Sequence, residues 1–307
     1  MISRRNIRVK VMQTLYALDS MDQAAKPGEP VRLLKRQFDQ TRQLLVYVIH
    51  FLTEVARYAE TDSRNRASKH LPSAADLVVN TKIAGNSLLW KILEDQSFIS
   101  AVKEEMVDRY LDKELIRKIY HQLADSDIYK EYISEQGRDP KTEKALIDYI
   151  YSNLLITNEA FTSHLEEHFN NWDDDCEMVN LLVQNYLSKP GTYNFHEILS
   201  ADKWQFAKSL VETVLDKDAL TLDLIKPKLK NWDPDRIATL DMILMRMGVC
   251  EFLYFETIPP KVTINEYIDL AKEYSTPQSG QFVNGILDSI HKDLLRDDKF
   301  QKVTYKK

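Results

Sequence analysis

Glycine is scarce in this sequence, with 7 among 307 residues, and proline contributes only 10 more. Sheet proteins rich in hairpins need such residues where the backbone takes unusual turn geometry. No segment alternates apolar and polar residues between turn signals, as a half-buried strand does. The apolar residues recur instead with the 3.6-residue period of helices, and 29% of residues are charged. The sequence therefore predicts an all-α protein, with enough residues for one large domain or two.

Cysteine is nearly absent as well. Cys176 and Cys250 stand far apart without the spacing of a metal site, so we expect two buried thiols in a reducing compartment. No run approaches 18 uncharged apolar residues, so no membrane contact is expected. The charged N-terminus also lacks the apolar segment of a signal peptide, which favours a cytoplasmic protein.

The motifs of common enzyme classes are missing too. The sequence has neither a glycine-rich phosphate loop nor a serine or cysteine in a nucleophile elbow. His164 and His168 stand four residues apart in the string HLEEH, the order seen in one class of zinc metallohydrolases. No third ligand is evident, and a solvated helix face explains the string as well. We predict a non-catalytic protein without metal or cofactor and keep a zinc metallohydrolase as the alternative.

Positive charge is concentrated at the N-terminus. The segment 3–18 predicts an amphipathic helix, and the first ten residues hold Arg4, Arg5, Arg8 and Lys10 with no acidic residue. The whole chain carries a net charge of −6, and a basic end on an acidic body is the footprint of a phosphate-binding site. A solvated basic helix end has the same charge pattern. We expect the three arginines to act together, off the apolar stripe and without neighbours that cancel their charge.

Near the other end, residues 259–287 predict two short helices joined by a polar turn. Thr263 suits the N-cap of the first helix, and Thr276 suits that of the second. Gly280 and Gly285 lie inside the second helix, where each costs about 1 kcal/mol relative to alanine. We therefore expect something to approach this helix closely.

This helical hairpin closely resembles the C-terminal signature of the NusB family of bacterial transcription antitermination proteins. The matching residues are Pro260–Val262, Ile264–Glu266, Asp269–Lys272, Ser279 and Phe282–Asp288. The first helix is similar to the arginine-rich first helix of that family through Arg4, Arg5, Arg8, Gln13, Leu15 and Tyr16. The resemblance implies NusB-like helical bundles that bind boxA-type single-stranded RNA together with the ribosomal protein NusE, as part of the transcription elongation complex.

Two sets of site residues follow from the charge pattern and the resemblance. The RNA-binding set is Arg4, Arg5, Arg8, Gln13, Gln281, Phe282 and Asn284. The partner-binding set, for the ribosomal protein, is Tyr16, Asp241, Arg246 and Glu251. Phe282 is the candidate for base stacking, although plain core packing explains an aromatic residue there equally well. Gln278 replaces an acidic residue that family members often carry, which leaves the partner contact at that point open.

The resemblance covers about residues 1–20 and 202–291. We interpret residues 21–201 as an inserted helical region and residues 292–307 as a charged tail. The string Asn-Trp-Asp occurs at 171–173 and again at 231–233, which indicates either a duplicated helix–turn–helix unit or a coincidence.

A polar segment, residues 61–73, is predicted to be a loop inside the inserted region. Its cations, Arg64, Arg66 and Lys69, favour a solvated connector over a second RNA contact.

The NusB fold also forms the N-terminal domain of certain ribosomal-RNA methyltransferases. Only a short tail follows the signature here, so no methyltransferase domain is expected. The sequence thus predicts a non-catalytic, RNA-binding transcription antitermination or termination factor. A helical scaffold that binds only proteins, through the inserted region, is a further alternative.

Overall fold

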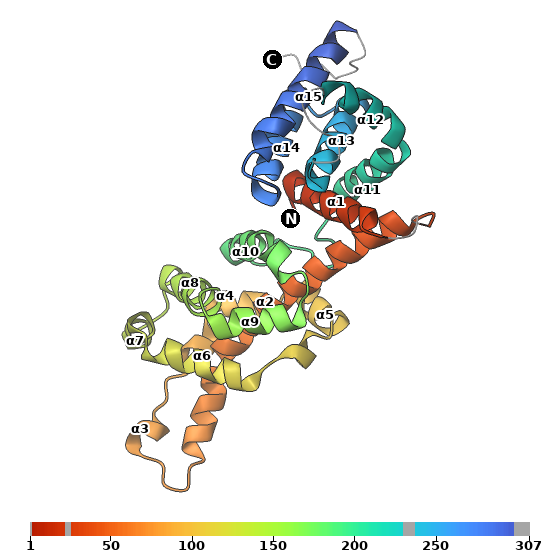
Figure 1. The fold of residues 1–307 in the computed structure, drawn as a ribbon. Helices are drawn as coiled ribbons and strands as arrows, with labels where there is room; N and C mark the ends of the chain where they lie inside the picture. The colour runs from red at the N-terminus through yellow and green to blue at the C-terminus, as the bar shows by residue number, and fades with distance from the viewer. Residues whose placement is uncertain (1, 22–25, 230–236, 298–307) are drawn as a thin grey trace. The chain divides into compact units, whose positions relative to one another are not determined.

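The computed structural model describes residues 2–21, 26–229 and 237–297 (Figure 1). Across these ranges every regular element is a helix and no strand occurs, which confirms the all-α prediction. No helix in the described ranges is both long and apolar enough to cross a bilayer. The chain divides into two compact units. The terminal unit combines residues 2–38 with the residues from Leu199 onward, and the central unit is residues 39–198.

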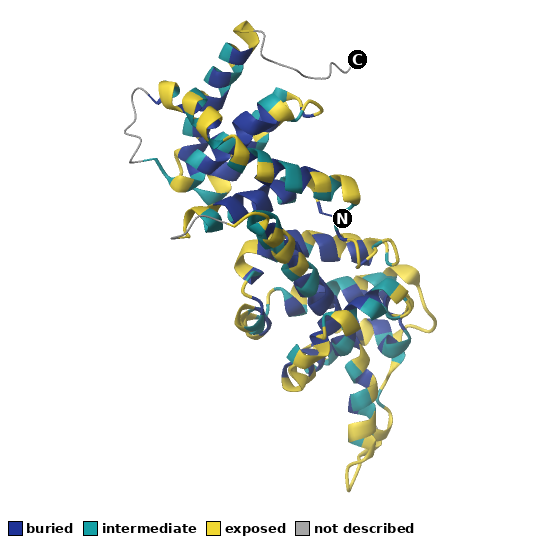
Figure 2. Ribbon diagram, turned by 90° about the vertical axis from the view of Figure 1, so that its right-hand side faces the viewer, coloured by how far each residue is buried: buried dark blue, intermediate teal, exposed yellow. Residues whose placement is uncertain are grey.

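The terminal unit is a helical bundle built from both ends of the chain. Its helices are α1 (Arg4–Asp19), the beginning of α2 (Glu29–Ala67), α11 (Ala201–Asp216), α12 (Asp218–Ile225), the 3-10 turn η4 (Lys226–Lys228), α13 (Thr239–Tyr254), α14 (Pro260–Tyr274) and α15 (Ser279–Arg296). Helix α13 packs against α14 and α15, while α1 packs against α11 and α13. Figure 2 shows buried residues on the facing sides of these helices.

Helix α1 forms where the sequence predicts it. The Ser3 side chain caps its first turn by accepting a hydrogen bond from the Asn6 amide at 3.1 Å. Its apolar stripe, Ile7, Val11 and Leu15, is buried. The stripe fixes α1 against the bundle, so side chains on its first turn have defined positions.

The predicted helical hairpin is confirmed as α14 and α15, but both predicted caps are wrong. Helix α14 begins at Pro260, and the Thr263 hydroxyl donates instead to Glu251 inside the bundle. Helix α15 begins at Ser279 rather than beside Thr276. Proline suits the first helical turn, which leaves Thr263 free for a tertiary hydrogen bond.

The two glycines of α15 differ in their surroundings. A Cβ on Gly280 would lie 2.7 Å from Cγ of Lys272, so α14 does approach α15 closely there. A Cβ on Gly285 would meet no atom within 4 Å, and this residue is exposed. The expected close approach therefore holds within the protein at Gly280, while Gly285 leaves an open surface.

The central unit contains the rest of α2 and a series of shorter helices. They are α3 (Ala74–Leu77), η1 (Lys82–Gly85), α4 (Ser87–Leu93), α5 (Gln96–Glu104), η2 (Val107–Tyr110), α6 (Lys113–Asp125), α7 (Asp127–Ser134), α8 (Pro140–Tyr149), the π-helical η3 (Ile150–Leu155), α9 (Glu159–His168) and α10 (Trp172–Ser188). Helix α2 continues to Ala67, so the prediction of a loop from residue 61 is wrong in its first half. Ion pairs such as Arg66–Asp62, four residues apart, support these polar last turns.

The predicted insert, residues 21–201, and the observed central unit, residues 39–198, have different boundaries. Helix α2 begins in the terminal unit and runs without a break into the central unit. Its apolar residues recur along the whole segment, so the sequence has no signal at residue 38 that separates the two parts.

The structure describes only part of the predicted duplication around the two Asn-Trp-Asp strings. The segment before Trp172 consists of α8, η3 and α9, and the segment sixty residues later consists of α11, α12 and η4. Trp232 and the rest of the second Asn-Trp-Asp string lie outside the described residues. Asp175, in the first turn of α10, is buried and accepts hydrogen bonds from Thr41 and Asn171 at 2.7 and 2.6 Å. The duplication stays a prediction.

Candidate nucleic-acid interface

The side chain of Arg8 lies on the buried face of α1 and is only 2% exposed. Its Nε and Nη2 donate to the two carboxylate oxygens of Glu251 at 2.7 and 3.1 Å, and Nη1 donates to Glu266 at 3.2 Å. Burial alone lowers the pKa of this guanidinium, but the hydrogen bonds and charge of Glu251 outweigh it and raise the pKa above its ordinary value. Arg8 is therefore a fixed cation that joins α1 to α13 and α14.

Glu251 is the centre of this buried polar cluster. It is fully buried on α13 and accepts hydrogen bonds from the hydroxyls of Thr263 at 3.0 Å and Tyr267 at 2.8 Å, besides those from Arg8. Burial and the charge of Glu251 raise the pKa of the Tyr267 hydroxyl. A buried carboxylate with this many donors is stabilised by its partners rather than by water.

The cluster corrects two premises behind the predicted sites. Arg8 was expected to project from the surface, yet it lies three residues before Val11 and seven before Leu15, which places it on the buried stripe. Glu251 was expected on a partner-binding face, yet it is fully buried. The i, i+3, i+7 spacing is the signal in the sequence that places Arg8 inside, while its partner, 243 residues away, has no local signal.

Arg4 and Arg5 lie on the accessible side of α1. The guanidinium of Arg4, an exposed residue, lies 5.5 Å from the ring centre of Phe206. Arg5, 36% exposed, donates to Glu273 at 2.7 Å and lies 3.9 Å from Asp269. The expectation of uncancelled charge is therefore wrong for Arg5 as well as for Arg8. Surface ion pairs are weak, so a phosphate can compete for Arg5.

The first turns of α15 present an open polar strip. Gln281, Asn284 and Gly285 are exposed, and Phe282 between them is half-buried. Arg5 contacts the last turns of α14, and residues 275–278 lead directly from that end of α14 to α15 (Figure 1). The start of α1 and the start of α15 therefore adjoin the same end of the α14–α15 hairpin.

The turn of this hairpin is held from below by Asp241. Ser279 donates to Asp241 at 2.7 Å and accepts from the Thr276 amide at 3.2 Å. Asp241 is only 5% exposed, so this predicted partner contact acts instead as an anchor of the turn. Gln278 lies exposed on the same turn.

The remaining predicted residues are more accessible. Tyr16 is 46% exposed. Arg246 is half-buried and pairs at 2.6 Å with Asp218, at the start of α12. Gln13 is half-buried, and its Nε2 donates no hydrogen bond to any described residue. Tyr16 is thus the predicted partner residue with the largest accessible surface.

The two histidines of the HLEEH string belong to an aromatic cluster. His164 Nε2 lies 2.5 Å from the Tyr47 hydroxyl, and its ring lies 4.4 Å from that of His168 and 6.3 Å from that of Phe51. Burial and the neighbouring His168 lower the pKa of His164. Within the described ranges, no three histidine, cysteine or acidic side chains gather where they could hold a metal ion. The geometry gives the zinc alternative no support.

The terminal unit thus defines a class of helical protein in which a basic N-terminal helix is clamped to a C-terminal helical hairpin. The NusB family model matches residues 165–292, which include the hairpin and the helices before it. Two relatives of high similarity share more than two thirds of their own length with the chain. The chain belongs to the NusB family, and it is longer than a typical member.

The relatives are curated as transcription antitermination protein NusB. The protein from Methylacidiphilum infernorum is 43% identical over 101 residues, covering 33% of this chain and 70% of the relative. The protein from Salinibacter ruber is 38% identical over 125 residues, covering 35% of this chain and 78% of the relative. No solved structure matches the chain significantly. Proteins of this family are non-catalytic, and the comparisons also leave the zinc metallohydrolase without support.

Proposed function

We propose that this chain is a cytoplasmic transcription antitermination factor that binds boxA-type single-stranded RNA together with the ribosomal protein NusE in the elongation complex. The observation that carries the proposal is the contact of Arg5 on α1 with Glu273 at the end of α14. This contact brings the basic helix beside the hairpin that carries the family signature. Cations beside exposed amides and an aromatic ring suit single-stranded RNA.

Each side chain has a distinct part in the proposed RNA contact. Arg4 and Arg5 are the accessible cations and bind phosphates. Gln281 and Asn284, both exposed, offer donors and acceptors to base edges, and the half-buried Phe282 offers a ring edge for stacking. The bare surface at Gly285 lets RNA come close to α15. Gln13 supplies an amide at the margin of the proposed RNA contact. Arg8 positions α1 and does not touch RNA.

The test is a double variant, Arg4→Ala with Arg5→Ala, titrated with a boxA-type RNA oligomer across a salt series. Loss of two phosphate contacts lowers the salt slope by about 1.4, since each contact on a single strand contributes about 0.7. Binding weakens roughly tenfold, in line with about 0.7 kcal/mol for each contact. The matched control is Arg32→Ala with Arg36→Ala, two exposed arginines of α2 in the same unit. Equal effects of the two double variants, or no effect of either, contradict the proposed interface.

The ribosomal partner is proposed to bind the terminal unit at the exposed Tyr16 on α1. Asp241, Arg246 and Glu251 act in this proposal by holding the helices in place, through Ser279, Asp218 and Arg8. Calorimetric titration with purified NusE tests the assignment. Tyr16→Ala should weaken NusE binding without changing the affinity for RNA alone, and an unchanged NusE affinity would remove Tyr16 from the partner surface.

A further inference from the structure

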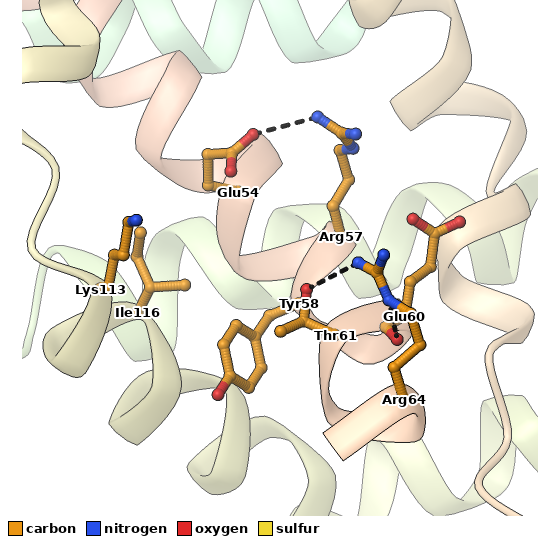
Figure 3. A pocket seen from close by; sticks show the side chains of 8 residues that line it. All are labelled: Glu54, Arg57, Tyr58, Glu60, Thr61, Arg64, Lys113 and Ile116. Atoms are coloured by element: carbon orange, nitrogen blue, oxygen red, sulfur yellow. Dashed lines mark hydrogen bonds and ion pairs between the residues drawn. The ribbon is translucent and has the colours of Figure 1, made fainter. Parts of the chain in front are cut away.

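A pocket of about 270 Å³ lies within the central unit, between the last turns of α2 and the start of α6 (Figure 3). Arg57, Tyr58 and Arg64 line it from α2, and Lys113 and Ile116 line it from α6. Pockets for small ligands start at about 300 Å³. A pocket of this size therefore suits a ligand no larger than one nucleotide.

Two of the cations in this pocket are not neutralised by a carboxylate. Arg64 donates to the Glu60 carbonyl and to the Thr61 hydroxyl, both at 3.3 Å, and both acceptors are uncharged. Lys113 is exposed and forms no ion pair with any described residue. Arg57 pairs with Glu54 at 3.2 Å, which reduces its contribution.

The neighbouring cations of the same polar segment form ion pairs within the protein. Arg66 pairs with Asp62 at 2.8 Å, and Lys69 pairs with Asp76 at 2.7 Å. Of the three cations considered from sequence as a second RNA contact, Arg64 alone thus keeps its charge available, and it lines the pocket.

Tyr58 supplies a fixed aromatic ring. The ring packs at 5.3 Å from that of Tyr120 and is only half-exposed, so its orientation is held from behind. Figure 3 draws it between Lys113 on α6 and Arg64 on α2. An aromatic face between two cations matches a nucleotide, whose base stacks while its phosphate is held by charge.

We propose that this α2–α6 pocket binds one nucleotide of a single-stranded RNA, with its base on Tyr58 and its phosphate held by Arg64 and Lys113. The inference rests on the proposed RNA-binding function and adds a second contact on the central unit, outside the NusB-type interface. Glu54 and Glu60, which also line the pocket, can accept a hydrogen bond from an N–H group of the base, such as N3–H of uracil. The chemistry recognised is a nucleotide, whether part of an RNA chain or free.

The first test compares variants by fluorescence anisotropy with a labelled uridine oligomer. Arg64→Ala combined with Lys113→Ala should weaken binding five- to tenfold and lower the salt slope by about 0.7, because the two cations hold one phosphate. Tyr58→Leu, which keeps an apolar side chain against Tyr120, should weaken binding without changing the slope. The matched control is Arg117→Ala, an exposed arginine of α6 that pairs with Glu114 and does not line the pocket. Circular dichroism checks that all variants fold.

The second test separates this inference from the proposed function. Crosslinking with a 4-thiouridine oligomer should label residues 54–64 in the wild-type protein and in the Arg4→Ala, Arg5→Ala variant. If the Arg4 and Arg5 changes weaken binding, while the pocket variants match the wild type and no label appears there, the pocket proposal is overturned and the proposed function stands. If the wild-type protein binds no RNA oligomer, both the pocket proposal and the proposed function are wrong.

Competition identifies the source of the nucleotide. Uridine monophosphate should displace the oligomer from the pocket far better than inorganic phosphate at the same concentration. Saturation by uridine monophosphate with no oligomer crosslink at the pocket would assign the pocket to a free nucleotide and would overturn the proposed RNA contact. Equal competition by inorganic phosphate would show that the base is not recognised and would overturn the proposal.

Discussion

Arg8 and Arg5 stand three residues apart on one helix, yet their environments give them different roles. Arg8 is 2% exposed and bonded to the fully buried Glu251, whereas Arg5 is 36% exposed and bonded to the partly exposed Glu273. Removing one partner of a buried ion pair leaves an uncompensated charge, while a surface pair contributes little. We therefore expect the stability of the fold to depend on Arg8, whereas Arg5 is the residue available to the proposed RNA contact.

We predict that Arg8→Ala lowers the free energy of unfolding by about 3–5 kcal/mol, because Glu251 is left buried without its cation. Arg5→Ala is the matched control and should lower it by less than about 1 kcal/mol. Urea denaturation followed by circular dichroism measures both. Similar losses for the two variants would show that the Arg8–Glu251 pair is not a special source of stability.

For single residues, the sequence predicts the helix that contains a residue better than it predicts the side chains that the residue contacts. The basic character of the first helix and its place in the bundle follow from residues 3–18 alone. The role of Arg8 depends on Glu251, Glu266 and Tyr267, which reach it only through tertiary packing. The charge pattern does not separate the three arginines, because charge carries no information on burial; only the spacing of Arg8 from Val11 and Leu15 places it inside.

Among the helices, two glycines illustrate how the effect of a glycine depends on its surroundings. Gly248 on α13 is tightly enclosed: a Cβ there would lie 2.9 Å from a methyl carbon of Leu287 and 3.4 Å from the ring of Tyr267. Both neighbours are buried, so they have little freedom to move aside. Gly285 lies in the exposed interior of α15, where a Cβ would meet nothing within 4 Å.

The same substitution should therefore have opposite effects at these two positions. Gly285→Ala should raise the free energy of unfolding by about 0.5–1 kcal/mol, because alanine is the better helix former. Gly248→Ala should lower it by about 1–3 kcal/mol through overpacking. Thermal denaturation of both variants tests the pair, and a loss of stability for Gly285→Ala would mean that α15 is more constrained than its open surface indicates.

Helices are also the scale at which sequence analysis succeeds most. The 3.6-residue period is local, so α1 and the α14–α15 hairpin are predicted from their own residues. Helix ends are less certain, because the side chains that cap a helix in isolation can be used elsewhere. Thr263 is such a case, since its hydroxyl is bonded to Glu251, and Thr276 is bonded to Ser279 within the turn.

The whole chain consists of two units, each with its own core, and α2 belongs to both. The predicted insert and the central unit coincide only in part, because a continuous helix gives no sequence signal where one core ends and the next begins. The α2–α6 pocket was also beyond sequence analysis, since its two sides are about fifty residues apart along the chain.

Perturbation of one core should therefore stay within its own unit. Hydrogen exchange followed by mass spectrometry should show faster exchange in α1, α13 and α14 of the Arg8→Ala variant, with α6 and α10 unchanged. The reciprocal control is Arg138→Ala, which removes the 2.6 Å partner of the buried Glu143 in the central unit. Its effect should appear in α4 and α8 and not in α13. Faster exchange in both units for either variant would show that the protein unfolds as one cooperative body.

The pairing of Arg8 with Glu251 also sets an order of events during synthesis. The two residues are separated by 243 positions, which a bacterial ribosome takes roughly 12–50 s to translate at about 5–20 residues per second. All residues of the central unit leave the ribosome before Glu251 is made. Helix α1, although translated first, must wait for α13 and α14 before its apolar stripe and Arg8 are covered. The basic helix of a nascent chain is therefore among the last elements to reach its final place, and chains that end before residue 251 never acquire it.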